Sequence, residues 1–189
     1  MPVLIYKPMQ SAPAQFLQFW SDVYGYAKEN LYEENIDKKL TEQSIFALFE
    51  WKNGTPLSNR KKESVRRNFV DRRGELEQLQ PDMEPEKFLA HFAHGGAIWR
   101  IFWLHCWQPL RFPIYDQHVH RAMTFILTGV QEEIPALDSR KIDSYVRRYL
   151  PFHATFDGVC RRPRSVDKAL WAFGKFLKEA NFPTGCVAA

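Results

Sequence analysis

The segment FPIYDQHVHRAM, residues 112–123, contains an aspartate, two histidines and an arginine that could take part in chemistry. Asp116, His118 and His120 are potential metal ligands, and a carboxylate such as Asp116 can also stabilise charge or activate water. On a helix, residues two positions apart point roughly 200° apart, so His118 and His120 cannot both face one ion. The spacing therefore disfavours a metal site, and it leaves open whether Asp116 is only a helix cap or also a group with a chemical role.

The elements that position these residues are predicted to be helices, because nearly every patterned segment repeats its apolar residues with a period of 3.6. The predicted helical segments are 11–31, 41–54, 57–80, one from about 85, one ending near 107, 116–128, 140–151 and 165–183. No convincing strand pair is found. The sequence predicts an all-α fold in one domain, 1–189, with an N-terminal helical part at about 10–84 and a second part at about 85–179.

Several residues mark where these helices begin and end. Asp116 stands at the N-cap position of the helix 116–128, and Thr41 and Ser165 are predicted to cap two others. Asn53-Gly54 is a stop signal, and the helix 140–151 is expected to end at its proline, with a loop over 152–164.

Gly95 and Gly96 join two predicted helices, which makes this region a helix–hairpin–helix. Glycines let the backbone approach a phosphate closely, and the exposed N–H groups at the start of the second helix can bind that phosphate. One further short connection leads from the second helix to Asp116. A Gly-Gly pair alone often marks only a tight turn, so the order of these elements matters more than the pair itself.

The charge of the chain is distributed unevenly. Residues 60–73 hold seven Lys or Arg against two acids, and residues 140–168 hold eight against three, while the whole chain has a net charge of +4. Basic runs of this kind are typical of proteins that bind a polyanion such as nucleic acid, and they also occur on solvated helix faces.

The remaining composition limits the class of protein. Aromatic residues make up 15% of the chain, which is ample for a packed core. Three cysteines without CxxC spacing disfavour both a disulfide framework and a Cys-ligated zinc or iron–sulfur site. No apolar run is long enough to span a bilayer and no signal peptide is found, so we expect a cytoplasmic protein, in the bacterial cytosol or nucleoid.

The ordered set of hairpin, apolar helix, loop and IYDQHVHR resembles the helix–hairpin–helix superfamily of DNA glycosylases, over about residues 85–179. The resemblance places Asp116 on the catalytic aspartate of that family, His118 on its helix histidine and Arg121 on its arginine. KALWAFGKFL is similar to a late helix of the family. The resemblance implies a two-lobed, all-helical glycosylase fold without an iron–sulfur cluster.

Two departures from the family pattern bear on mechanism. The hairpin reads FAHGGAIW where the family has a Leu-Pro-Gly-x-Gly turn, and no lysine occurs between Lys87 and Lys141. The resemblance therefore implies a monofunctional enzyme, without the lysine that forms a Schiff base in the bifunctional members. A carboxylate such as Asp116 would stabilise the oxocarbenium character that develops on the sugar, or activate water.

The resemblance also suggests which residues would contact DNA, although each could equally be a core or surface residue. Candidates for the pocket of a flipped-out base are Trp99, Trp51, Lys52 and His118. Candidates for contacts with the DNA backbone are Gly95, Gly96, Arg100, Arg66, Arg67, Arg161, Arg162 and Arg164.

The predicted function is therefore hydrolysis of the N-glycosidic bond of a damaged or modified base in DNA, which leaves an abasic site. Its role would be base-excision repair or defence against modified phage DNA, and we expect a monomer without a cofactor. One alternative is a non-catalytic nucleic-acid-binding protein with a glycosylase-like fold. The other is a metal hydrolase that uses Asp116, His118 and His120.

Overall fold

The computed structural model describes residues 12–159 and 163–180, and every regular element within them is helical. The predicted all-α class is thus confirmed. The α-helices are α1 (Pro13–Val23), α2 (Glu29–Glu33), α3 (Glu42–Asn53), α4 (Asn59–Val65), α5 (Pro85–His91), α6 (Ala97–Trp107), α7 (Gln117–Thr128), α8 (Asp138–Asp143), α9 (Leu150–Ala154) and α10 (Pro163–Glu179). Three further helical segments are not α-helical: the π-helices η1 (Arg66–Val70) and η3 (Ser144–Tyr149) and the 3-10 helix η2 (Arg73–Gln78).

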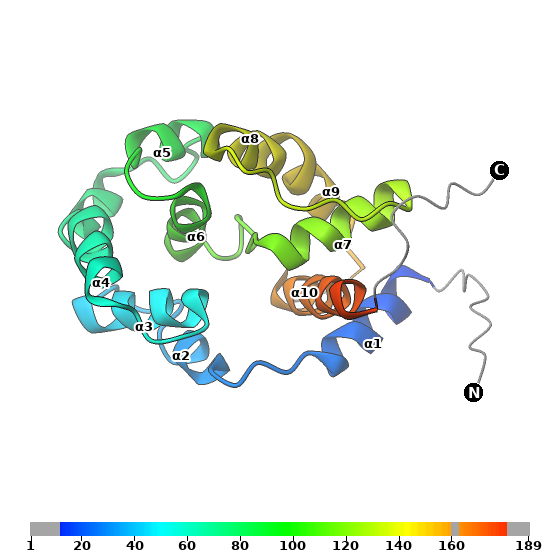
Figure 1. Cartoon of the computed structure of the whole chain (residues 1–189). Helices are drawn as coiled ribbons and strands as arrows, with labels where there is room; N and C mark the ends of the chain where they lie inside the picture. Colours follow the sequence, from blue (N-terminus) through cyan, green and yellow to red (C-terminus); the bar gives the residue numbers. More distant parts are fainter. Residues whose placement is uncertain (1–11, 160–162, 181–189) are drawn as a thin grey trace.

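The helices form two groups around one apolar core (Figure 1). The first and last helices, α1 and α10, pack side by side, and α7 packs on α10. The helices α2 to α6 form the other group, and α6 also contacts α8. The buried core is continuous from Leu17 in α1 through Trp103 in α6 to Leu177 in α10. In the part of the chain that the structure describes, no helix has both the length and the apolar character to cross a bilayer.

The helices α7 and α10 approach each other closely because residue 174 has no side chain. A Cβ atom on Gly174 would lie 1.9 Å from the backbone oxygen of His118. The guanidinium of Arg121, only 1% exposed, donates from Nη1 to the Gly174 oxygen at 3.2 Å and from Nη2 to Glu133 at 2.7 Å. These contacts hold the first turn of α7 against the middle of α10.

Two predicted helix ends are confirmed on α3. The hydroxyl of Thr41 accepts a hydrogen bond from the Ser44 N–H, and Ser44 bonds back to the Thr41 N–H as a capping box. Gly54 ends the helix with φ 78°, a left-handed conformation that glycine adopts without steric cost.

The predicted helix over 11–31 is wrong, because α1 ends at Val23 and α2 begins only at Glu29. Tyr24 leaves the helix with ψ 123°, and its hydroxyl donates to Glu29 at 2.6 Å. The tertiary contacts of Tyr24 outweigh the helical pattern, and Gly25 next to it has a low helix propensity. After the break, Tyr24 and Tyr26 are partly buried, while Gly25 and Ala27 are exposed.

The predictions around the last helices also need correction. The helix does not end at Pro151, because α8, η3 and α9 run without a break from Asp138 to Ala154. The π-helical turn before Pro151 accommodates the missing N–H of the proline. Ser165 lies inside α10, which already includes Pro163, and is therefore not its N-cap.

Candidate active site

The connection that enters α7 is fixed by buried hydrogen bonds. The ring of His105 accepts from the Tyr32 hydroxyl at 2.7 Å and donates to the Phe112 oxygen at 2.6 Å. Burial lowers the pKa of His105 to about 3, so the ring stays neutral and can make both bonds. The Tyr145 hydroxyl donates to the Pro113 oxygen at 3.2 Å. The backbone that leads to residue 116 therefore has a defined path.

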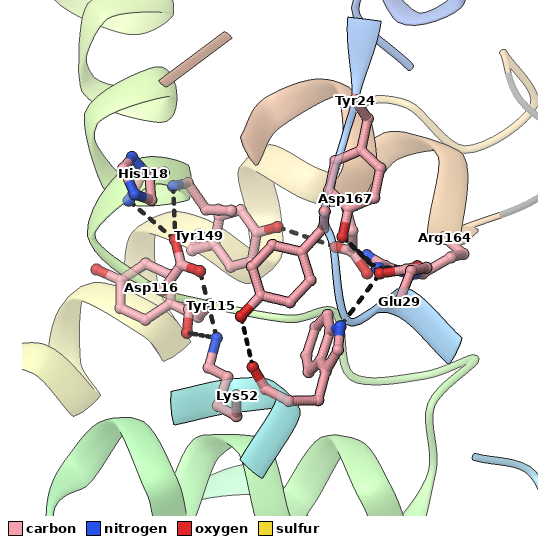
Figure 2. Close-up of polar contacts among 12 residues, drawn as sticks. Tyr24, Glu29, Lys52, Tyr115, Asp116, His118, Tyr149, Arg164 and Asp167 are labelled. Carbon is pink, nitrogen blue, oxygen red and sulfur yellow. Dashed lines mark hydrogen bonds and ion pairs between the residues drawn. The ribbon is translucent and has the colours of Figure 1, made fainter. Parts of the chain in front are cut away.

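The carboxylate of Asp116 caps α7, as predicted. Its Oδ1 accepts from the N–H groups of His118 at 2.9 Å and Val119 at 3.1 Å. Its Oδ2 lies 3.4 Å from the ammonium of Lys52, which also donates to the Tyr115 oxygen at 3.0 Å (Figure 2). Although burial favours the neutral acid, the charge of Lys52 and the two N–H groups lower the pKa of Asp116 below its usual value. The group is ionised at neutral pH.

Asp116 lines a small, partly enclosed cavity of about 50 Å³. Four separate segments of the chain contribute its walls: residues 24–26, the end of α3, the start of α7 with the preceding loop, and the first half of α10. Its aromatic side chains are Tyr24, Tyr26, Trp51 and Trp171. Its charged or titratable side chains are Lys52, Asp116, Arg164 and Asp167.

One wall of the cavity is a network around Glu29 (Figure 2). Glu29 accepts from Arg164 at 2.7 Å, from the Tyr24 hydroxyl at 2.6 Å and from the Trp51 indole N–H at 3.1 Å. Burial acts against the anion, but Arg164 and these hydrogen bonds lower the pKa of Glu29. The guanidinium of Arg164 also lies over the ring of Tyr32, 4.6 Å from its centroid. The network links Tyr24 and Trp51 of the aromatic wall to Arg164 of α10.

Asp167 is a second carboxyl group in the same cavity, and it is only 3% exposed. Its Oδ1 accepts from the Tyr149 hydroxyl at 3.4 Å (Figure 2). Burial raises the pKa of Asp167 to about 7, although Arg164 and the Ile114 N–H favour the anion. Burial outweighs the charge of Arg164, whose guanidinium is directly paired with Glu29.

The structure brings some of the predicted site residues together and separates others. Trp51, Lys52 and Arg164 line the cavity with Asp116. The ring of His118 packs against Trp171 with 5.2 Å between centroids, next to this cavity, and its burial lowers the pKa of the imidazole. Trp99 does not line the cavity, because its ring packs against Phe49 in the core at 5.3 Å.

The two histidines of the opening motif diverge, as the helical spacing predicts. His120 turns inward, where its Nδ1 lies 2.8 Å from the Tyr115 hydroxyl, while His118 faces α10. Within residues 12–159 and 163–180, no group of three or more His, Cys, Asp or Glu side chains is arranged to hold a metal ion. The geometry therefore gives no support to the metal-hydrolase alternative.

The hairpin lies between α5 and α6, as predicted, with Gly95 at φ 92°. The start of α6 differs from the expectation of exposed N–H groups, because the Ala97 N–H donates to the Asp138 carboxylate at 3.0 Å. Arg100 turns back and donates to the Leu89 oxygen in α5. A carboxylate from α8 therefore occupies one of the positions where a DNA phosphate was expected.

A basic groove runs beside the hairpin. Its lining includes Arg67, Arg72, His91, His94 and Gly95. Arg67 is exposed, and no hydrogen bond or ion pair of its side chain is found among the described residues. Its neighbour Arg66 instead pairs with Glu42 on α3 at 2.5 Å. The predicted DNA contacts Arg161 and Arg162 lie outside the described residues.

Sequence reasoning missed six residues that line the cavity, and also Glu29, which bonds to three of its lining side chains. The six are Tyr24, Tyr26, Ile114, Val119, Asp167 and Trp171. Three cavity residues of α10, Arg164, Asp167 and Trp171, are spaced i, i+3, i+7, so they lie on one side of the helix. The sequence did contain one signal for this side of α10: Arg164 and Asp167 are two charged residues three positions apart, next to the apolar face of the helix. Tyr24 and Glu29 gave no signal, because they were predicted to lie in one unbroken helix.

Comparisons with protein-family models, with curated proteins and with solved structures find no significant match to this chain. The resemblance to the glycosylase superfamily therefore depends on the motifs of the sequence alone.

Proposed function

We propose that the chain is a monofunctional DNA glycosylase, which hydrolyses the N-glycosidic bond of a damaged or modified base. The observation that supports this most is the placement of Asp116. An ionised carboxylate is fixed at the start of α7, where it lines a cavity with aromatic walls. Such a group can stabilise positive charge on a sugar without any rearrangement during the reaction.

The chemistry follows from the two oxygens of Asp116. Oδ1 is held by backbone N–H groups, so the carboxylate cannot rotate freely. Oδ2, which lies 3.4 Å from the Lys52 ammonium, would face C1′ of the nucleotide as the bond to the base breaks and the sugar gains oxocarbenium character. Lys52 keeps Asp116 ionised and positions Oδ2 through its second bond to the Tyr115 oxygen.

The cavity must open before it can hold a base. Its volume of about 50 Å³ is smaller than the cavity of roughly 150 Å³ that holds benzene in a protein core. Part of the wall comes from the non-helical segment 24–28 and from Trp171, which is only partly buried. We propose that these side chains move apart when a flipped nucleotide enters, and that the aromatic rings then stack on the base.

DNA is the proposed partner, and the groove beside the hairpin is the proposed contact with its backbone. Arg67 and His94 present their side chains there, next to Gly95. Contacts of this kind bind DNA regardless of sequence, and they supply most of the affinity.

The proposal is tested with Asp116→Asn. Asparagine caps helices as well as aspartate does, so we expect the variant to fold with little change in stability. Release of bases from a panel of damaged and hypermodified duplexes, detected as alkali-labile sites, should fall at least about a hundredfold, the scale on which loss of one charge-stabilising group acts. DNA binding should remain. Undiminished base release from this variant would contradict the proposed role of Asp116.

The same assay tests whether the enzyme is monofunctional. The sequence places no lysine near the hairpin, but the fold brings Lys52 to Asp116 from α3. A protonated amine in an ion pair has no lone pair for attack on C1′, so we expect no covalent adduct with DNA after borohydride treatment. A trapped adduct that disappears in Lys52→Met would show a lyase activity instead.

The non-catalytic alternative has two observations in its favour. The cavity is closed, and Asp138 occupies the start of α6. A non-catalytic protein would bind DNA with a strong dependence on salt and would release no base from any duplex in the panel. Release of hypermodified bases alone would indicate a role in phage defence, and release of damaged bases would indicate repair.

A further inference from the structure

The cavity contains two carboxyl groups in opposite environments. Asp116 is held by two backbone N–H groups and a lysine, all of which stabilise the anion. Asp167 is almost completely buried, its Oδ1 accepts from the Tyr149 hydroxyl at 3.4 Å, and one backbone N–H, that of Ile114, also bonds to the carboxyl group. Two carboxyl groups in one site whose environments differ in this way commonly serve as a general acid and a general base.

We propose that Asp167 is the general acid of the reaction, donating its proton to a ring nitrogen of the departing base, and that the substrate is a neutral purine. This assignment rests on the proposed glycosylase function. A purine carries N3 and N7, which are not bonded to the sugar and have a lone pair that can receive the proton. Protonation at either atom neutralises the charge that the base acquires as it leaves.

The groups that face Asp167 explain why it can hold a proton. The hydroxyl of Tyr149 in η3 and the ring of His153 in α9 lie at 3.4 Å and 3.8 Å from Oδ1. Burial lowers the pKa of His153 to about 4, so this ring is neutral at pH 7 and adds no charge. Two cations, Arg164 and Lys52, favour the anion at longer range, but each is bonded to another acid, Glu29 or Asp116.

Each proton and electron pair in the proposed step has a defined destination. The C1′–N9 bond breaks, its electron pair passes to the base, and the proton of Asp167 moves to N3 or N7. Water adds its oxygen to C1′ and gives a proton to Asp116. The products are the free purine and an abasic sugar with a hydroxyl at C1′. Asp167 is then ionised and Asp116 protonated, and exchange with solvent restores both.

The test compares leaving groups that need a proton with one that does not. The base of 7-methylguanine is already a cation in DNA and leaves as a neutral molecule. Hypoxanthine and 1,N6-ethenoadenine are neutral, have lone pairs on N3 and N7, and need the acid. In Asp167→Asn we expect release of the neutral purines to fall about a hundredfold or more, the usual contribution of a general acid, and release of 7-methylguanine to fall less than about tenfold.

The matched control is Glu33→Gln, which removes an exposed carboxylate that pairs with Lys168 of α10 outside the cavity. This variant should release every base at the rate of the natural chain. If Asp167→Asn does not fold, the pH profile of the natural chain replaces it. Release of neutral purines should then fall as pH rises through about 7, where Asp167 loses its proton, while release of 7-methylguanine should not.

The outcomes separate this inference from the proposed function. Equal losses for neutral and cationic bases in Asp167→Asn, or no loss for either, overturn the role of Asp167 alone. Release of only pyrimidines or only cationic bases by the natural chain also overturns it. Release of no base at all overturns the glycosylase proposal, and the role of Asp167 with it.

Discussion

Asp116 divides its two oxygens between structure and chemistry. Oδ1 accepts from two N–H groups that have no helical acceptor at the start of α7, and Oδ2 pairs with Lys52. The first role depends only on neighbours in the sequence, which is why Asp116 could be predicted as a helix cap. The ion pair with Lys52 joins residues 64 positions apart, and no local pattern of the sequence indicates such a pair.

Replacing Lys52 should change the pH dependence of the reaction. Lys52 lowers the pKa of Asp116, so Lys52→Met is expected to raise that pKa, because a close opposite charge that favours the anion is lost. Asp116 must be ionised to act. The acid limb of the pH–rate profile should therefore move to higher pH, measured as base release between pH 4 and 8.

Lys28→Met is the matched control for this prediction, because Lys28 forms a more exposed ion pair with Glu50 on the same helix, α3. Its profile should coincide with that of the natural chain. An acid limb that stays in place in Lys52→Met would show that the ion pair does not determine the ionisation of Asp116.

At the scale of elements, the helices α3, α5, α6 and α7 follow the sequence patterns closely. Caps and stops such as Thr41, Gly54 and Pro85 act over a few residues, so they can be recognised without knowledge of the fold. The predictions of helix boundaries are wrong where tertiary contacts determine the backbone conformation. The helix over 11–31 breaks at Tyr24 because the hydroxyl of Tyr24 reaches Glu29, and that contact depends on the position of α10 through Arg164.

The close contact between α7 and α10 should not tolerate a methyl group. In Gly174→Ala the new Cβ would meet the His118 backbone oxygen at 1.9 Å, so the helices must separate. We expect a loss of about 1–3 kcal/mol or more in the free energy of unfolding, despite the better helix propensity of alanine. Base release should fall as well, because the start of α7 carries Asp116.

Gly74→Ala is the control for this effect. Gly74 lies in the 3-10 helix η2, and nothing lies within 4 Å of a Cβ placed there. Urea denaturation should show this variant to be at least as stable as the natural chain, since alanine reduces the freedom of the unfolded state. Equal stability of the two variants would mean that α7 and α10 can move apart without cost.

At the scale of the whole molecule, the cavity exists only because distant segments meet. The pairing of α1 with α10 brings residues 24–29 to Arg164, and the packing of α6 carries the chain back to α7 beside α3. The sequence predicts the helices and Asp116, but it contains no local signal for the pairing of its two ends. That pairing determines the surroundings of Asp167, so the second acid could be recognised only in the folded chain.

The uneven charge of the molecule leads to a prediction about DNA binding. Arg67 is exposed in the groove beside the hairpin, and a contact with phosphate there would release about one counterion. In Arg67→Ala we expect weaker binding to every duplex sequence, and a plot of log affinity against log salt whose slope is reduced by about one.

Arg66→Ala provides the comparison, because the adjacent arginine is already paired with Glu42 and faces α3. Its salt slope should change less than that of Arg67→Ala. The same slope in both variants would show that the groove is not the surface on which DNA lies.

The contact between Asp138 and the Ala97 N–H has a consequence for the order of events on DNA. One N–H cannot serve two anions, so a phosphate can bind there only by exchanging places with Asp138. That exchange frees the first turn of α8, which continues into η3, where Ser144 accepts a hydrogen bond from the Tyr115 hydroxyl. Tyr115 directly precedes Asp116. Binding of the DNA backbone at the hairpin would thus act through the helical run α8–η3 on Tyr115, the residue next to Asp116.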